Sequence, residues 1–377
     1  MDDGAGYETD TLDRTISARF IPDVNGLRMH VLEAGRDPER PCVILLHGFP
    51  ELAYSWRNML QPLAEAGYHV VAPDQRGFGR TTGWDGAYDA DLASFRLLNR
   101  VRDVIGLVTG LGRDSVLAVI GHDSGAPVAA WCAMLRPDIF HSTVLMSAPF
   151  AGPPTRGSEG TRIERMNAAL SRLPRPRKHY QWYYSSRIAN HDMLHCPQGV
   201  HDFLRAYYHY KSADWAGNDP FPLAGWSAEE LAKLPTYYVM ELHKGMAETV
   251  APYLPPPEHV EACRWLPDAE LRVYSAEYER TGFQGGLQWY RCGTDPRYQR
   301  DLSVFSGWTV DVPSAFIAGR HDWGVYQSPG SFETMQNDAC TDMRECILLE
   351  DAGHWVQQEQ PERVADALIG FLNDDSA

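Results

Sequence analysis

A glycine-framed aspartate is the feature that most constrains the fold of this chain. Residues 121–125 read GHDSG and join an apolar segment typical of a buried strand, 116–120, to an alanine-rich segment typical of a helix. A nucleophile at such a turn has glycine two residues before and two residues after it, because side chains there would crowd the strained backbone. Gly121 and Gly125 give this spacing to Asp123. The sequence therefore predicts a strand-turn-helix corner that carries a carboxylate nucleophile.

The neighbouring Ser124 is an alternative nucleophile, because serine is common at such corners. The residues two positions away from it are His122 and Ala126, so side chains would stand where the turn needs glycine. Asp123 could instead only cap the N-terminus of the helix, a role that aspartate often has. That role alone does not explain both glycines, and we take Asp123 as the candidate nucleophile.

Predicted strands and helices alternate in the first part of the chain, and the alternation returns near its end. This order favours a mainly parallel sheet that is covered by helices on both faces. The strands are predicted at 27–33, 42–46, 68–72, 116–120, 142–146, 313–319 and 346–349, and the helices at 56–66, 92–111, 127–135 and 364–371.

The alternation stops in a long middle segment that is rich in tyrosine, tryptophan, histidine and proline. We interpret this segment as an inserted, largely helical cap. The predicted organisation is therefore a core domain in two pieces, 1–150 and 306–377, with the cap at 151–305 between them.

Charge and composition exclude several classes of partner. The formal net charge of −16 opposes binding to a phosphate backbone. No apolar stretch is long enough to span a membrane, and the acidic start lacks the basic and apolar parts of a secretory signal. The seven cysteines are scattered without close pairs, as reduced thiols are. We expect a cytoplasmic protein that binds neither nucleic acid nor a membrane.

A metal or cofactor is not expected either. His191, His195, Cys196 and His201 lie close together in the chain, but their spacing does not fit a compact tetrahedral site. No glycine-rich phosphate loop follows a predicted strand.

A carboxylate that attacks carbon forms an ester, and release of that ester needs a base that activates water. His354 follows the last predicted strand, in a loop at the edge of the sheet where ligand-binding residues collect. Asp322 directly follows the preceding strand and can orient the histidine. Glu350 and Asp351 are alternatives, but their closeness to His354 in the chain makes a hydrogen bond to its ring awkward. The order nucleophile, acid, histidine is that of α/β-hydrolases.

The segment 47–50 ends another predicted strand, where backbone N–H groups can stabilise a developing negative charge. The candidate donors of this oxyanion hole are the amides of Phe49 and Ser124. A plain Gly-Pro loop is the alternative interpretation of the same segment.

The motifs HGFPE at 47–51, DQRGFG at 74–79 and GHD at 121–123 together resemble those of the α/β-hydrolase-fold epoxide hydrolases. The similarity extends over nearly the whole chain. It implies a mostly parallel eight-stranded sheet flanked by helices, an inserted helical cap and chemistry without a cofactor. It also gives Asp322 and His354 the remaining places of the catalytic triad.

Two cap segments are similar to those that supply ring-opening tyrosines in this family. GLQWYR at 286–291 matches one and implies a role for Tyr290, and HYQWY at 179–183 matches the other and implies Tyr180, with Tyr183 as the nearest alternative. A phenol with a pKa of about 10 stays protonated at neutral pH and can donate a proton to the opened ring. We also expect substrate contacts from His47, Pro50, Trp289, Trp323 and Trp355.

The resemblance implies hydrolysis of an epoxide to a vicinal diol, through an ester on Asp123 that water activated by His354 hydrolyses. Haloalkane or haloacid dehalogenation with the same triad, a serine esterase built on Ser124, and a non-catalytic ligand receptor are the alternatives. Ser124 departs from the bulky residue that the family often carries after its nucleophile, which disfavours a halide site. The aromatic cap suggests a bulky apolar epoxide as substrate, and a homodimer is possible.

Overall fold

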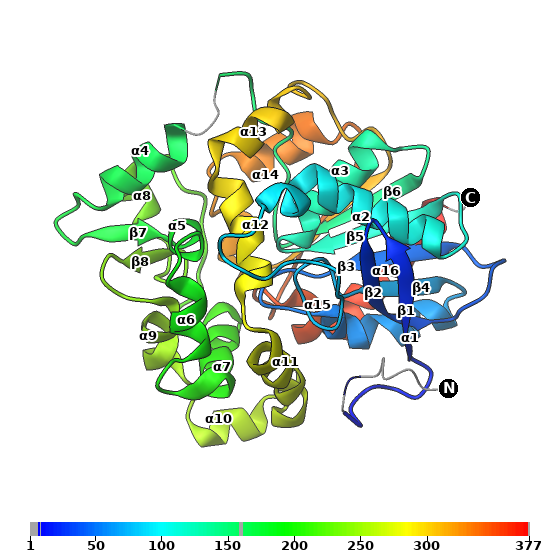
Figure 1. Cartoon of the computed structure of the whole chain (residues 1–377), viewed down its shortest axis with the longest axis horizontal. Coiled ribbons are helices and arrows are strands. Elements are labelled where there is room, and N and C mark those ends of the chain that lie inside the picture. Colours follow the sequence, from blue (N-terminus) through cyan, green and yellow to red (C-terminus); the bar gives the residue numbers. More distant parts are fainter. Residues whose placement is uncertain (1–6, 8, 158–160, 376–377) are drawn as a thin grey trace.

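Eight strands form one twisted sheet in the order β1-β2-β4-β3-β5-β6-β9-β10 (Figure 1). The structure is a computed structural model that describes residues 7, 9–157 and 161–375. β1 and β2 run antiparallel to their neighbours, and all other neighbouring pairs are parallel, which confirms the predicted mostly parallel sheet. The strands are β1 (Ser17–Val24), β2 (Leu27–Ala34), β3 (Cys42–Leu46), β4 (His69–Pro73), β5 (Val116–His122), β6 (Phe140–Met146), β9 (Ser314–Gly319) and β10 (Met343–Leu349).

Helices cover both faces of this sheet, as the alternating sequence predicts. α1 (Arg57–Glu65) packs against α16 (Pro361–Asp375), and α2 (Leu97–Gly110) packs against α3 (Gly125–Leu135). Every residue of β3 is buried, which explains why its sequence is a continuous apolar run without alternation. The α/β-hydrolase fold is therefore confirmed.

Two local predictions for the core were incomplete. The single helix predicted at 92–111 is interrupted, because Arg96 has an extended backbone (ψ 149°) between η2 (Leu92–Phe95) and α2. The Arg96 guanidinium forms an ion pair with Asp301 in a distant helix, 3.0 Å away, and the sequence pattern does not show this contact. The strand β1 was not predicted, because most of its residues are only partly buried and its apolar pattern is weak.

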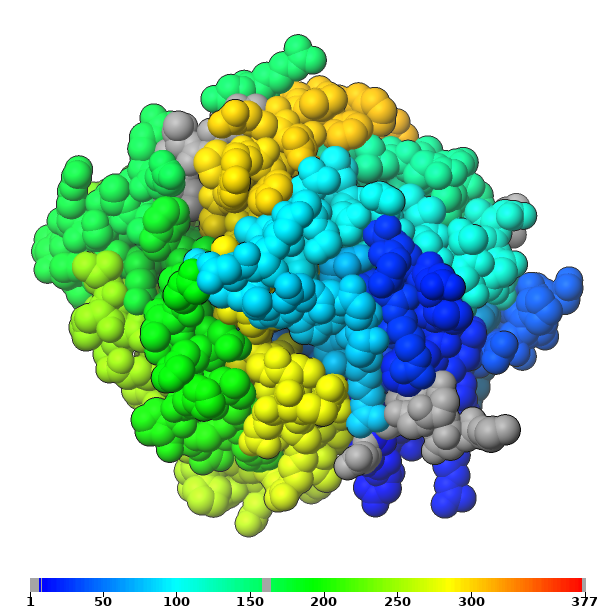
Figure 2. Space-filling view, in the orientation of Figure 1, coloured from blue at the N-terminus to red at the C-terminus, as the bar shows by residue number. Residues whose placement is uncertain are grey.

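The segment between β6 and β9 is largely helical and also contains a two-stranded sheet, which the sequence did not predict. It lies to one side of the core, at the left of Figure 1, and its green and yellow parts adjoin the blue and cyan core in Figure 2. The boundaries of the cap at residues 151 and 305 stay a prediction. The elements of this segment are α4 (Thr161–Leu170), β7 (Arg177–His179), α5 (Tyr180–Tyr184), α6 (Ala189–Leu194), α7 (Gly199–Lys211), α8 (Ala228–Leu231), β8 (Val239–Glu241), α9 (Met246–Val250), η3 (Ala251–Tyr253), α10 (Pro257–Ala262), α11 (Asp268–Thr281), α12 (Gln284–Thr294) and α13 (Pro296–Ser303).

The parallel strands β3, β5, β9 and β10 end at the same edge of the sheet, and the loops that follow them carry the candidate site residues. The middle segment covers this edge, and its helix α12 lies next to the core in Figure 1. The short elements around these loops are η1 (Ala53–Trp56), η4 (Trp323–Val325), α14 (Ser331–Thr334), η5 (Met335–Ala339) and α15 (Val356–Glu359).

Two further findings concern the described part of the chain. None of its helices combines the length and the apolarity that crossing a lipid bilayer requires. Its seven cysteines are all free thiols, five of them buried.

The glycines of the corner after β5 give a first testable prediction. A Cβ atom on Gly125 would lie 2.7 Å from the carbonyl oxygen of His47 and closer still to that of Leu46. Gly125→Ala should therefore lower the free energy of unfolding by about 2 kcal/mol, through overpacking that the backbone cannot relieve. Urea unfolding monitored by circular dichroism measures this change.

Gly370→Ala in α16 is the matched control, because a Cβ there meets nothing within 4 Å. This variant should gain about 0.5–1 kcal/mol, since alanine has the higher helix propensity. Equal stability of the two variants would contradict the close approach of strand and helix at the corner.

Candidate active site

Asp123 stands at the sharp turn between β5 and α3. Its backbone has a φ of 50°, which non-glycine residues rarely adopt. A Cβ on Gly121 would lie 2.7 Å from the amide nitrogen of Ala126, so glycine is required where strand and helix cross. The side chain of Asp123 is 13% exposed, and it faces a cavity. The glycine spacing therefore corresponds to a real steric constraint.

His354 lies between the two predicted carboxylates. Its Nε2 atom is 3.2 Å from Oδ2 of Asp123, and its Nδ1 atom is 3.0 Å from Oδ1 of Asp322. His354 and Asp322 are each only 1% exposed. The amide of Gly324 donates a second hydrogen bond to Oδ1 of Asp322, 2.6 Å away, which fixes that carboxylate. The structure thus brings together the three residues that the sequence selected.

The two alternative orienting acids lie elsewhere. Glu350 pairs with Arg320 at 2.9 Å, on the surface of the molecule. Asp351 is exposed, and its backbone adopts a φ of 60° in the loop that leads to His354. Neither carboxylate forms a hydrogen bond with the ring of His354, whose Nδ1 atom is paired with Asp322 instead.

The loop after β3 supplies a backbone donor to the nucleophile. The amide of Phe49 donates a hydrogen bond to Oδ1 of Asp123, 3.0 Å away. Gly48 makes this approach possible, because a Cβ there would lie 2.6 Å from the same oxygen. Ser124 lines the cavity at the start of α3, and its hydroxyl is buried without a hydrogen-bond partner among the described residues.

Asp123 is held in its ionised form. Burial by itself would raise the pKa of this carboxyl, but the contact with His354 and the positive charge of Lys211 outweigh burial and hold the pKa well below its usual range. The pKa of Asp322 is lowered for similar reasons, again against the effect of burial. The Asp123 side chain is therefore an ionised carboxylate throughout the neutral pH range.

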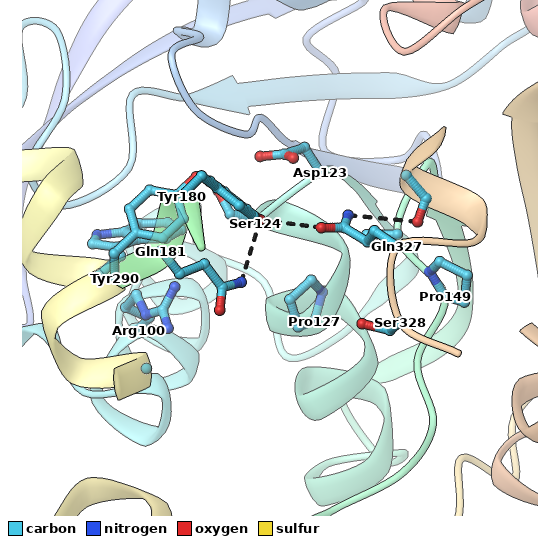
Figure 3. Close-up of a pocket in the computed structure, with 14 residues that line it drawn as sticks. Arg100, Asp123, Ser124, Pro127, Pro149, Tyr180, Gln181, Tyr290, Gln327 and Ser328 are labelled. Carbon is cyan, nitrogen blue, oxygen red and sulfur yellow. Dashed lines mark hydrogen bonds between the residues drawn. The ribbon is translucent and has the colours of Figure 1, made fainter. Parts of the chain in front are cut away.

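The cavity beside Asp123 has a volume of about 310 Å³, and polar and aromatic side chains line it (Figure 3). In Figure 3 the nucleophile lies at the top, Tyr180, Tyr290 and Arg100 lie at the left, and Gln327 and Ser328 lie at the right. The lining residues come from the core and from the middle segment of the chain. They are Arg100, Asp123, Ser124, Pro127, Ala148, Pro149, Tyr180, Gln181, Trp289, Tyr290, Gly293, Gly324, Gln327 and Ser328.

Of the five expected substrate contacts, Trp289 lines this cavity, and the expectation for the other four stays a prediction. The ring of His47 accepts a hydrogen bond from the amide of Gln75, 3.2 Å away, inside the core. Trp355 donates to the carbonyl of Tyr208 at 2.9 Å. The remaining two are also engaged in packing: the carbonyl of Pro50 accepts a hydrogen bond from Tyr208, and Trp323 packs against Phe221.

Tyr180 and Tyr290 both line the cavity, with ring centroids 5.9 Å apart. The hydroxyl of Tyr180 donates to Oε1 of Gln327 at 3.2 Å. Burial, followed by the negative charge of Asp123, raises the pKa of both phenols above the ordinary value, so they stay protonated. Tyr183 does not line the cavity, because its hydroxyl donates to Oδ2 of Asp192 at 3.2 Å.

The helix that carries Tyr290 is held tightly against the core. A Cβ on Gly77 would lie 2.6 Å from the carbonyl oxygen of Gly285, so the turn 74–79 and α12 touch through their backbones. Trp289 donates from its indole to the carbonyl of Arg76 at 2.9 Å. These contacts fix the position of Tyr290 above the sheet.

Potential metal ligands do not gather in the part of the chain that the structure describes. No group of three or more histidine, cysteine, aspartate or glutamate side chains there could hold a metal ion. Of the residues considered from the sequence, His201 is engaged by Asp268 at 2.8 Å, and the rings of His191 and His195 pack against each other at 4.8 Å.

This chain is similar over most of its length to several known proteins. A family model described as alpha/beta hydrolase fold matches residues 41–227. Epoxide hydrolase B of Mycobacterium tuberculosis is 33% identical over 362 residues, which cover 93% of this chain and 97% of that protein. Epoxide hydrolase 3 of Siraitia grosvenorii is 28% identical, and the match covers 93% of this chain and 96% of that protein. The solved structure of an epoxide hydrolase from an endophytic Streptomyces superposes with a TM-score of 0.77, at 30% identity and 96% coverage of both chains.

The chain belongs to the epoxide hydrolases of the α/β-hydrolase fold.

The sequence analysis missed a buried ion pair beneath the nucleophile of this epoxide hydrolase. Nδ1 of His122 lies 2.6 Å from Oε2 of Glu51, and both side chains are fully buried. Nε2 of His122 contacts the backbone carbonyl of His354 at 2.7 Å. Charge attraction from Glu51 raises the pKa of His122 although burial lowers it. Both residues belong to motifs that the sequence analysis quoted, but their pairing requires two loops that are far apart in the chain.

Lys211 is a second residue that the sequence analysis missed. It lies at the end of α7 and is 3% exposed. Its positive charge lowers the pKa of Asp123 and of Asp322. An unusual signal was present in the sequence, since this lysine follows a run of tyrosines in a buried helix. Its ammonium nitrogen lies 5.1–5.8 Å from the ring centroids of Tyr207, Tyr237, Tyr238 and Trp355.

The charge of Lys211 gives a prediction about pH. In Lys211→Met the pKa of the nucleophile should rise, because the nearby positive charge is lost. A carboxylate reacts only when ionised, so the acidic limb of the pH profile of kcat/KM should move to higher pH. Steady-state rates on styrene oxide across the pH range measure this limb.

Lys178→Met is the matched control, because Lys178 also lies over an aromatic ring, that of Tyr183 at 5.0 Å, but does not affect the pKa of either catalytic carboxyl. Its acidic limb should coincide with that of the unchanged protein. An unmoved limb in Lys211→Met would show that this cation does not control the nucleophile.

Proposed function

We propose that this chain hydrolyses epoxides to vicinal diols through a covalent ester on Asp123. The observation that carries the proposal is the position of one ionised carboxylate. It faces a cavity lined by two protonated phenols, and a buried histidine lies 3.2 Å from it. Membership of the epoxide hydrolase family supports the same reaction.

In the first half of the reaction, a carboxylate oxygen of Asp123 attacks one carbon of the epoxide. A carbon–oxygen bond of the ring breaks, and the ring oxygen takes a proton from Tyr180 or Tyr290. Two phenols that burial keeps protonated can polarise this oxygen before attack and supply the proton afterwards. The product of this half is an ester between the enzyme and a hydroxyalkyl group.

In the second half, His354 takes a proton from a water molecule, and the resulting hydroxide attacks the carbonyl carbon of the ester. Asp322 stabilises the imidazolium that forms. The amides of Phe49 and Ser124 stabilise the oxyanion of the tetrahedral intermediate. The intermediate collapses by breaking its bond to the hydroxyalkyl oxygen, which takes the proton of the added hydroxyl group, so that the diol leaves and Asp123 is again a carboxylate. Proton transfer from the imidazolium to the phenolate restores the other two groups.

The cap tyrosines favour this reaction over dehalogenation, because a departing halide needs no proton while a departing alkoxide does. A serine esterase is disfavoured, since His354 approaches Asp123 and the hydroxyl of Ser124 has no basic partner among the described residues. Full activity of an Asp123→Ala variant would contradict the proposal.

Replacement of the base separates the two halves of the reaction. His354→Gln should still form the ester but should hydrolyse it far more slowly, by about 100-fold or more. Intact-protein mass spectrometry during incubation with styrene oxide should then show an increase equal to the mass of the epoxide. Asp123→Ala should show neither adduct nor diol.

His195→Gln is the control for that experiment, because His195 is exposed and lies outside the cavity. It should turn over substrate without a detectable adduct. Absence of an adduct in His354→Gln together with normal diol formation would contradict the role of the base.

The tyrosine roles have their own test. Tyr180→Phe and Tyr290→Phe should each lower kcat/KM by about 100-fold, because each removes a donor to the ring oxygen. Tyr183→Phe should behave as the unchanged protein, since its hydroxyl is engaged by Asp192 outside the cavity. An equal loss in all three variants would indicate damage to packing instead.

The cytoplasmic location, a homodimer and a mainly apolar substrate stay predictions from the sequence. The cap boundaries at residues 151 and 305 stay predictions as well.

A further inference from the structure

Arg100 is an unusual residue of the cavity wall. It lies in α2, outside the sequence motifs of the family, and its side chain lines the same cavity as Asp123 (Figure 3). Its guanidinium forms no hydrogen bond or ion pair with any residue that the structure describes, and its Nε atom is buried without a partner. Arg100 as a whole is half-buried, and a half-buried cation on the wall of a cavity can reach a ligand that binds there.

The nearest carboxylate along the chain is engaged by another arginine. Asp103, one turn away on the same helix, accepts two hydrogen bonds from Arg76, at 2.8 and 2.7 Å. Burial lowers the pKa of Arg100 to about 10, against the charge of Asp103, so the guanidinium is still positively charged at neutral pH. The guanidinium thus forms no ion pair of its own with a carboxylate of the described residues, although the charge of Asp103 acts on it.

Stacking holds this charge in one orientation. The guanidinium carbon of Arg100 lies 4.0 Å from the ring centroid of Trp289. Contact through the flat face of a guanidinium leaves the N–H groups at its edge free for a ligand. Trp289 is itself fixed by its hydrogen bond to the carbonyl of Arg76. Arg100 is thus a preorganised donor.

We propose that the epoxide substrate of this chain carries a carboxylate, which Arg100 binds while the epoxide ring faces Asp123. This inference rests on the proposed function and names its substrate class. A planar guanidinium and a carboxylate can form two parallel hydrogen bonds, and this pairing satisfies donors that the protein leaves unused.

Charge and size agree with such a substrate. The chain has a formal net charge of −16, so an anionic substrate needs a local cation to enter and stay. The cavity volume of about 310 Å³ lies at the small end of the range of roughly 300–1000 Å³ for ligand pockets. A short apolar body between the epoxide and the carboxylate fits this space, and Tyr180, Tyr290 and Trp289 can contact that body.

Two matched pairs of substrates test the proposal with the full-length protein. The rigid pair is 4-oxiranylbenzoate and its primary amide, and the flexible pair is 5,6-epoxyhexanoate and its primary amide. The unchanged protein should prefer the acid of at least one pair in kcat/KM by about tenfold or more. Arg100→Gln should reduce this acid-to-amide ratio by about tenfold or more, mainly through KM, because a uniform binding contact is lost.

Arg102→Gln is the matched control, since Arg102 lies on the same helix and is exposed to solvent. It should leave the acid-to-amide ratio unchanged. Equal use of acid and amide in both pairs, or a ratio that Arg100→Gln does not alter, would overturn the proposal and leave the proposed function intact. Failure to open any of these epoxides, styrene oxide included, would instead refute the proposed function.

Inhibition of the unchanged protein covers the case in which Arg100→Gln does not fold. Benzoate should inhibit the hydrolysis of styrene oxide competitively and about tenfold more strongly than benzamide, which has the same shape without the charge. Equal inhibition by the two compounds would overturn the proposal without any substitution.

Discussion

The buried ion pair between Glu51 and His122 is the contact on which the geometry of the site depends. One oxygen of Glu51 accepts hydrogen bonds from His122 and from the amide of Gly48, and the other accepts from Gln357 and Gln358. These partners belong to the loop after β3, the corner after β5 and the segment after β10. A carboxylate taken fully out of water must keep all of its partners, since a lost partner leaves a charge unsatisfied. The three loops that carry the oxyanion donor, the nucleophile and the base are therefore fixed relative to one another.

Charge balance is the second theme of the site. Three carboxylates, those of Glu51, Asp123 and Asp322, lie close together and are largely removed from water, and one imidazole base lies between two of them. His122 compensates the first, and Lys211 lowers the pKa of the other two from within its cage of aromatic rings. Burial raises the pKa of the carboxyls and of the phenols alike, because it disfavours the charged form. The pKa values of the two carboxyls are nevertheless low, because His354 and Lys211 outweigh burial there. One cavity thus holds an ionised carboxylate together with two protonated phenols.

Local sequence signals predicted the parts of this structure that local physics controls. The glycines around Asp123, the apolar strands and the polar residues directly after them are each legible within a few residues, and the parallel topology then brings strand ends together. Contacts between distant segments could not be predicted in this way. Arg96, at the break between η2 and α2, pairs with the distant Asp301, and the small sheet of β7 and β8 pairs residues 177–179 with 239–241. The surroundings of Lys211 and Arg100 likewise come from segments far apart in the chain. Four other residues expected at the substrate, His47, Pro50, Trp323 and Trp355, contact other parts of the protein, and their role toward a substrate stays a prediction.

The middle segment of the chain leaves the sheet after β6 and returns at β9, and these two strands are direct neighbours. Because the two strands are parallel, the segment leaves the sheet at one edge and re-enters it at the opposite edge, one strand away, and the entropic cost of closing this loop rises only slowly with its length. Asp123 precedes the insertion, while Asp322 and His354 follow it, so these three residues stand on the core, whereas Tyr180 and Tyr290 stand on the insertion. A different insertion would therefore change the cavity wall and its phenols, while the strand ends would still carry the two carboxylates and the imidazole.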